Sequence, residues 1–301
     1  MGDAELKQMH CMEVWGGNRC IDSGVIMPGL DAWLYSQPCQ QQAEGGDVHY
    51  VSTCASGQVV RMLVADVSGH GPTVAQTAAD LRALMRRYVN YHDQLRFVRS
   101  LNREFTSASA DGIFATAVVM TFDAPTNRVL VSNAGHPPPL WWRARLREWT
   151  YLKPDAAVEG GDVPWGIIEG ADYHQFGVRL RVGDLVLSYT DCLPEARDRR
   201  GELIGAEGLL ERVRELGPPD AREFLPRLLD VIGREDESNL TRDDVTCLLI
   251  RPNGLRPRVP IRDLLLAPVR VVASWGGMRI GWTGAPKGLA TRTAATVPES
   301  V

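Results

Sequence analysis

The stretch Val59-Val60-Arg61-Met62-Leu63-Val64-Ala65-Asp66-Val67-Ser68-Gly69-His70-Gly71 carries the strongest structural signal of the chain. Residues 59–64 are apolar and rich in β-branched side chains, so they predict a β-strand that brings Asp66 to its end. Residues 68–72 break the strand, and a helical pattern follows. We therefore expect Asp66 at a sheet edge beside a helix N-terminus, a place that suits a cation and the anion it carries. For Asp66 taken alone, the alternative is a residue that caps a turn.

A second acidic residue is predicted at the same edge. Residues 48–54 form another candidate strand, which begins directly after Asp47, and residues 56–58 are typical of a hairpin turn. Antiparallel pairing of the two strands would bring Asp47 and Asp66 to one rim. Because two neighbouring carboxylates repel each other, this arrangement favours a cation between them.

Two further strands carry acidic residues at an end. The buried strand 185–190 ends at Asp191, and the strand 245–250 begins directly after Asp243 and Asp244. Ligands that are all oxygens select hard cations such as Mg²⁺ or Mn²⁺. Two such ions about 3.5–4 Å apart can activate a water and hold a phosphate. The sequence contains no Gly-x-Ser-x-Gly elbow and no Walker loop that would compete for the catalytic role.

Regular structure is predicted through most of the remaining chain. Helical spacing of apolar residues covers 74–88, 93–105, 206–216 and 221–232. A hairpin joins strands 113–122 and 128–133, and Trp141 and Trp142 are expected to continue that sheet. The loop 133–139 contains His136, which we interpret as a loop histidine fixed by local hydrogen bonds, with a ligand role as the alternative.

Composition narrows the function classes. The chain has 301 residues, 44% of them hydrophobic, so it can bury a full core. Its formal net charge of -4 argues against nucleic-acid binding as the main task. No stretch is long and apolar enough to span a membrane, and no secretory signal is visible, so we expect a cytoplasmic protein. The six cysteines form no Cys-x-x-Cys pair, which argues against a thiolate zinc site.

Three parts of the chain are expected. Residues 1–30 are interpreted as an extension packed on the domain, and residues 31–251 as the main domain. Residues 252–301 are expected to form a linker, a short apolar segment at 261–272 and a disordered tail. The apolar segment is expected to dock on the domain, and weak contact with a membrane surface is the alternative.

Six motifs occur in an order that resembles a known family. They are Glu44-Gly45-Gly46-Asp47, Asp66-Val67-Ser68-Gly69-His70-Gly71, Phe114-Ala115-Thr116, Asn133-Ala134-Gly135-His136-Pro137-Pro138, Tyr189-Thr190-Asp191 with Pro194-Glu195-Ala196, and Asp243-Asp244-Val245-Thr246. This order is similar to that of the SpoIIE-type metal-dependent serine/threonine phosphatases, relatives of protein phosphatase 2C in the PPM family. The resemblance covers about residues 30 to 250.

The resemblance implies an α+β fold and a metal centre. The fold would be a four-layer α-β-β-α sandwich of two mainly antiparallel sheets flanked by helices, with two Mn²⁺ or Mg²⁺ ions at one end. Asp66 would bridge the ions, the Val67 carbonyl would bind one of them, and Asp47 would assist. Asp191 and Asp243 would hold the other ion, with Asp244 as the less preferred member of its pair.

The resemblance also implies a reaction and a partner. Family members hydrolyse phosphoserine or phosphothreonine with metal-activated water, usually on anti-sigma factor antagonists in bacterial partner-switching pathways. His70 is a candidate general acid. Cys192 departs from the family, which commonly has Gly after the metal-binding Asp, and a left-handed backbone there would strain a cysteine.

Two other functions stay open. A catalytically silent adaptor of the same fold would bind a regulator, and Cys192 is the feature that favours it. A dinuclear hydrolase of small phosphoesters would turn over metabolites but no phosphorylated protein.

Overall fold

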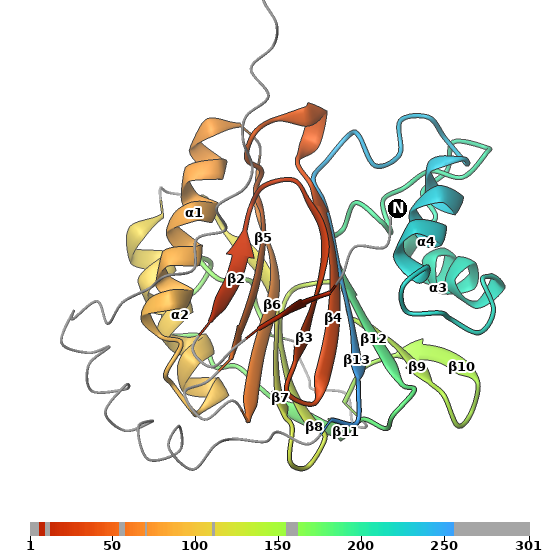
Figure 1. The fold of residues 1–301 in the computed structure, drawn as a ribbon. Coiled ribbons are helices and arrows are strands. Elements are labelled where there is room, and N and C mark those ends of the chain that lie inside the picture. The colour runs from red at the N-terminus through yellow and green to blue at the C-terminus, as the bar shows by residue number, and fades with distance from the viewer. Residues whose placement is uncertain are drawn as a thin grey trace, which may run out of the picture.

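The computed structural model describes residues 6–9, 13–53, 58–69, 71–109, 112–154 and 162–255. Two sheets pack face to face, with two helices over each outer face (Figure 1). This is the α+β, four-layer α-β-β-α sandwich that the family resemblance implies. The helices are α1 (Pro72–Arg87), α2 (Gln94–Ala108), α3 (Gly205–Glu215) and α4 (Phe224–Gly233), and a 3-10 turn covers Cys39–Gln41.

One sheet has six strands and carries the stretch around Asp66. Every pair in it is antiparallel, and α1 and α2 cover its outer face (Figure 1). The strands in spatial order are β11 (Phe176–Arg179), β8 (Arg128–Ala134), β7 (Ala115–Asp123), β6 (Val59–Val67), β5 (Asp47–Thr53) and β2 (Val14–Gly17).

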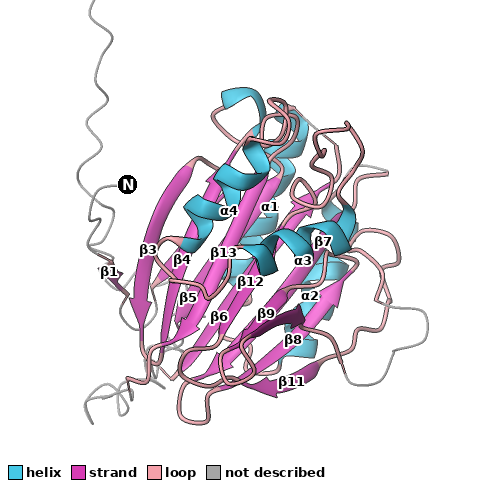
Figure 2. Cartoon of the chain, turned by 90° about the vertical axis from the view of Figure 1, so that its right-hand side faces the viewer, coloured by secondary structure: helices cyan, strands magenta, loops and turns pink. Residues whose placement is uncertain are grey.

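The other sheet has seven strands and lies under α3 and α4 (Figure 2). Its pairs are antiparallel except for the parallel pair of β1 with β3. The strands in spatial order are β1 (Lys7–Gln8), β3 (Ile21–Met27), β4 (Leu30–Gln37), β13 (Val245–Pro252), β12 (Leu185–Tyr189), β9 (Leu140–Arg143) and β10 (Glu148–Tyr151).

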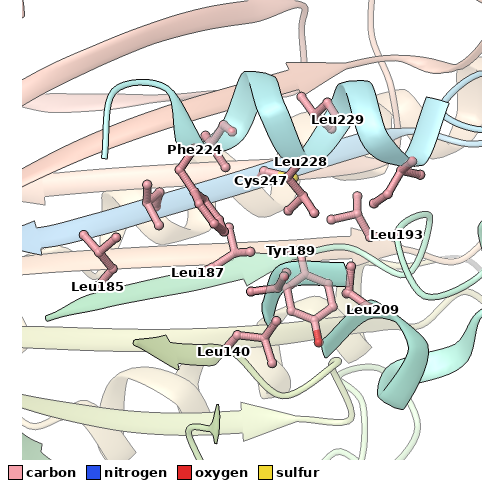
Figure 3. Close-up of a cluster of buried hydrophobic side chains, with 14 of the residues drawn as sticks. Leu140, Leu185, Leu187, Tyr189, Leu193, Leu209, Phe224, Leu228, Leu229 and Cys247 are labelled. Carbon is pink, nitrogen blue, oxygen red and sulfur yellow. The ribbon is translucent and has the colours of Figure 1, made fainter. Parts of the chain in front are cut away.

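Three apolar layers hold the sandwich together. Met62, Val118 and Leu248 belong to the layer between the sheets, which is why β6 and its neighbours are apolar on both faces. A second layer joins α1 and α2 to the six-stranded sheet. In the third, Phe224 and Leu228 of α4 point onto Leu187 and the neighbouring residues of β12 and β13 (Figure 3).

The buried faces of α1 and α2 follow from their sequences. The buried stripe of α1 includes Val74, Ala78, Leu81 and Met85, and Pro72 occupies its first turn, where a missing N–H costs nothing. In α2, the side chain of Asp93 caps the N-terminus. These two helices therefore fix the layer that covers β5, β6 and β7.

The structure differs from the sequence prediction in two places. Residues 14–27, expected as part of an extension packed on the domain, supply β2 to one sheet and β3 to the other. Trp141 and Trp142, expected to continue the sheet of β7 and β8, lie in β9 and pair with β12 in the other sheet. The loop 135–139 therefore crosses from one sheet to the other.

Several predictions concern residues outside the described ranges. These are His70, the first two residues of the expected turn at 56–58, and the tail from 256 onward with its apolar segment 261–272. Within the described part of the chain, no helix has the length and apolarity needed to cross a membrane.

Candidate metal centre

The β5–β6 pair brings two carboxylates together. Asp47 lies directly opposite Asp66 in the antiparallel register, as the sequence predicts. Asp47 is buried, with 3% of its surface exposed, and Asp66 is half-buried. Val67, the last residue of β6, lies beside Gly46, where a Cβ would come within 3.0 Å of the Val67 carbonyl oxygen. The glycine therefore allows this close approach of the two strand ends.

The seven-stranded sheet brings its acidic residues to the same end of the sandwich. Asp191 follows the end of β12, and Asp243 precedes β13, which pairs with β12. The pairing continues past the strand ends, because the Thr190 N–H donates to the Thr246 carbonyl over 3.0 Å. Both acidic segments are thus held at one edge.

A chain of buried hydroxyl groups joins the two halves of the site. The Thr190 hydroxyl donates to Oδ2 of Asp47 over 2.9 Å, and the Thr246 N–H donates to the same Thr190 oxygen over 3.0 Å. The hydroxyls of Ser36 and Thr246 lie 2.9 Å apart. Asp47 is therefore fixed to the opposite sheet, which accounts for a carboxylate in so buried a place.

Asp244 has a different task from Asp243. Its carboxylate accepts hydrogen bonds from the N–H groups of Cys39, Gly46 and Asp47. A Cβ at Gly45 would lie 2.3 Å from Oδ2 of Asp244, so only glycine leaves room for it there. Asp243 is exposed, and its Oδ1 accepts from the Asp244 N–H over 2.8 Å. The Asp244 carboxylate is thus engaged by three backbone N–H groups.

The carboxylates raise one another's pKa values. Burial, followed by the charges of Asp191 and Asp243, raises the pKa of Asp66 to about 7. Burial, followed by the charges of Glu195 and Asp243, raises the pKa of Asp191 to about 6. Burial, together with the charge of Asp66, raises the pKa of Asp47 well above its usual range. Acidic groups of both sheets therefore share one electrostatic environment, which a divalent cation would stabilise.

Glu195 is the acidic residue that sequence reasoning missed. Its N–H donates to the Asp191 carbonyl over 2.9 Å in the turn after β12. Its charge is the largest cause, after burial, of the raised pKa of Asp191. Its place in the motif Pro194-Glu195-Ala196 could have marked Glu195 as a candidate site residue. The sequence argument selected acidic residues at strand ends, and Glu195 does not lie at one. The turn brings it back to the rim.

The donor set suits a hard divalent cation by its chemistry, because every candidate ligand atom is an oxygen. Within the described ranges, no three histidine, cysteine or acidic side chains stand close enough together to form a ready-made cage. Binding would therefore require these carboxylates to turn towards the ion.

Cys192 fits its position without strain. It is buried, and its φ does not lie in the left-handed region. Burial raises the pKa of its thiol, which disfavours the reactive thiolate. Cys192 therefore packs as a small apolar residue beside Asp191, and Cys247 is likewise buried in the core.

The fold is similar to that of solved phosphatase domains of the protein phosphatase 2C type. The solved phosphatase domain of SpoIIE from Bacillus subtilis, described as a PP2C domain, superposes with a TM-score of 0.62 at 15% identity, covering 80% of this chain and 63% of that one. RsbX, solved in complex with magnesium, superposes with a TM-score of 0.54 at 15% identity, covering 77% of this chain and 99% of that one.

Comparison of the amino-acid sequence with known families identifies the family of the chain. The profile of stage II sporulation protein E (SpoIIE) matches residues 56–253, more than half of the chain. The chain belongs to the SpoIIE family. It is also 23% identical over 224 residues to the phosphoserine phosphatase RsbU of Bacillus subtilis (strain 168), an alignment that covers 74% of this chain. The chain spans 63% of the length of this curated relative.

Proposed function

We propose that the chain is a phosphatase that removes phosphate from phosphoserine or phosphothreonine of a protein, with two Mn²⁺ or Mg²⁺ ions. The observation that carries this proposal is the meeting of acidic groups from both sheets at one rim, where they raise one another's pKa values. The membership in the SpoIIE family and the similarity to RsbU support it.

The proposed ligands are Asp66 and the Val67 carbonyl on one sheet and Asp191 and Asp243 on the other, with Asp47 assisting. Such ions, when bound, lower the pKa of water and neutralise the charge of a phosphate. The protein's part is to hold the carboxylates: the Thr190 hydroxyl fixes Asp47, and the backbone N–H groups around Gly46 fix Asp244. His70, four residues after Asp66 in the sequence, is the proposed general acid.

The proposed substrate is a phosphorylated protein of a signalling pathway in the cytoplasm. The similarity to RsbU, a phosphoserine phosphatase, favours phosphoserine. An anti-sigma factor antagonist of a bacterial partner-switching pathway is the specific substrate that we propose.

Phosphate release from a phosphoserine protein tests this proposal. Asp66→Asn and Asp191→Asn should each lower kcat/KM by more than about 100-fold, since each removes a charge at the cations themselves, whereas groups one shell further out cost about 10- to 100-fold. Asp220→Asn is the matched control, because this exposed aspartate only accepts from the Arg222 N–H over 2.8 Å and should leave the rate unchanged.

The alternatives give different results in the same assay. A catalytically silent adaptor would release no phosphate, with manganese or with a chelator. A hydrolase of small phosphoesters would turn over p-nitrophenyl phosphate and metabolites but leave the phosphoserine protein intact. Full activity in both aspartate variants would contradict the proposed site.

A further inference from the structure

The crossing between the sheets places a buried histidine beneath the acidic rim. β8 ends at Ala134 in one sheet and β9 begins at Leu140 in the other, at the end of the sandwich where Asp66 and Asp191 lie. His136, in this crossing, has 5% of its surface exposed. It thus lies between the two halves of the candidate metal centre.

His136 contacts the strand next to Asp66. Its Nδ1 lies 2.8 Å from the Thr116 hydroxyl, and Thr116 is the residue directly opposite Asp66 in the β6–β7 register. Opposed residues on one face of a sheet lie close enough for their side chains to interact. The backbone of Tyr189, two residues before Asp191, is near enough to the imidazole to raise its pKa, against the larger effect of burial.

The loop holds the imidazole in place. The Asn133 side chain donates to the His136 carbonyl over 2.8 Å and accepts from the His136 N–H over 2.7 Å. The Tyr189 hydroxyl donates to the Pro138 carbonyl over 3.0 Å, which ties the crossing to the second sheet. Gly135 adopts a φ of +68°, which favours glycine at this turn.

The imidazole is neutral in this setting. Burial lowers the pKa of His136 to about 3, so the ring offers one donor and one acceptor. Its Nε2 is buried, and no described residue forms a hydrogen bond with it. His136 therefore offers no positive charge to a phosphate, and within the described ranges its ring forms a hydrogen bond with Thr116.

We propose that His136 is a positioning residue that, through Thr116, sets the place of Asp66 relative to Asp191 and thereby the affinity of the rim for divalent cations. This inference rests on the proposed metal centre and adds a residue that is not among its proposed ligands. His136 acts on Asp66 only through the strand beside it.

Calorimetric titration with Mn²⁺ of the whole chain tests the inference. Thr116→Val, which keeps the shape but removes the hydroxyl, should weaken Mn²⁺ binding about 10- to 100-fold, as loss of a group that orients ligands does. His136→Gln should do the same, because its amide extends towards the Nε2 side of the ring. His136→Asn, whose amide lies near the position of Nδ1, should restore most of the affinity.

The control lies on the same strand. Thr121→Val removes a buried hydroxyl that accepts from Arg61 Nε over 3.2 Å, far along β7 from the rim. It should lower the free energy of unfolding and leave Mn²⁺ affinity unchanged. A purely structural role for His136 would give this same pattern in Thr116→Val and His136→Gln, and that pattern overturns the inference.

Failure of the inference and failure of the proposed function are distinguishable. If the wild-type chain binds Mn²⁺ and releases phosphate while Thr116→Val binds Mn²⁺ equally well, only the positioning role is wrong. If the wild-type chain neither binds Mn²⁺ nor releases phosphate, the proposed function and the inference both fail. Should His136→Gln not fold, Thr116→Val alone decides between these results.

Discussion

At the scale of single residues, the molecule keeps ionisable groups where burial disfavours their charged forms. Asp47 and Asp66 face each other across two strands, and burial is the largest cause of the raised pKa of each. Such placement lowers stability unless a cation compensates for it. The Thr190 hydroxyl compensates for part of this cost at Asp47, and a cation at the proposed metal centre would compensate for more of it.

His49 is a buried ionisable residue outside the rim. It lies in β5 with 3% of its surface exposed, and no described residue forms a hydrogen bond with its Nδ1. Burial, together with the charge of Arg82, lowers its pKa from 6.5 to about 3. The unfolded chain therefore binds a proton at His49 below pH 6.5 that the folded chain does not bind.

This difference predicts a pH dependence of stability. Because the folded pKa is lowered, the contribution of His49 is fully present above pH 6.5 and is lost as the pH falls towards 3. Urea unfolding in EDTA should show the stability of the wild-type chain relative to His49→Gln falling by about 1.4 kcal/mol per pH unit between pH 5.5 and 4. Parallel curves for the two proteins would show that His49 titrates normally.

At the scale of elements, α2 fixes a loop on the rim of the six-stranded sheet. Asn102 of α2 is fully buried, and its amide donates to the carbonyls of Ile168 and Glu169 over 2.8 and 2.9 Å. The same loop pairs with β7 through two hydrogen bonds of 2.8 Å between Trp165 and Ala115. Ala115 has Val67 of β6 as its neighbour on the other side, so β7 lies between the loop and the end of β6.

Removing this amide should destabilise the domain. Asn102→Ala leaves the two carbonyls and the Gly166 N–H without their partner and should lower the free energy of unfolding by about 2–3 kcal/mol. Ser107→Ala on the same helix, whose hydroxyl only donates to the Arg103 carbonyl at the surface, should change it by less than about 0.5 kcal/mol. Equal losses of unfolding free energy for the two variants in a urea titration would show that the Asn102 amide does not stabilise the loop.

At the scale of the whole molecule, the sequence predicted the parts whose signals are local. The apolar strands that end at Asp66 and Asp191 and the stripe of α1 follow from periodicity alone, and the sheet register brings Asp47 opposite Asp66 as expected. These features needed no knowledge of distant contacts.

The rest depends on contacts between distant segments. Residues 14–17 form a strand because they pair with β5. The four residues of β9 belong to the seven-stranded sheet because they pair with β12. Glu195 reaches the rim through a turn, and Asp244 binds backbone N–H groups of residues about 200 positions away. No periodicity in the sequence encodes such placements.

Manganese anomalous diffraction from crystals of the wild-type chain tests the central claim most directly. Anomalous peaks are expected at the rim, beside the carboxylates of Asp66 on one sheet and Asp191 on the other, and they should weaken in Asp66→Asn. Well-occupied manganese only at other places on the surface, with none between these two aspartates, would contradict the proposed metal centre.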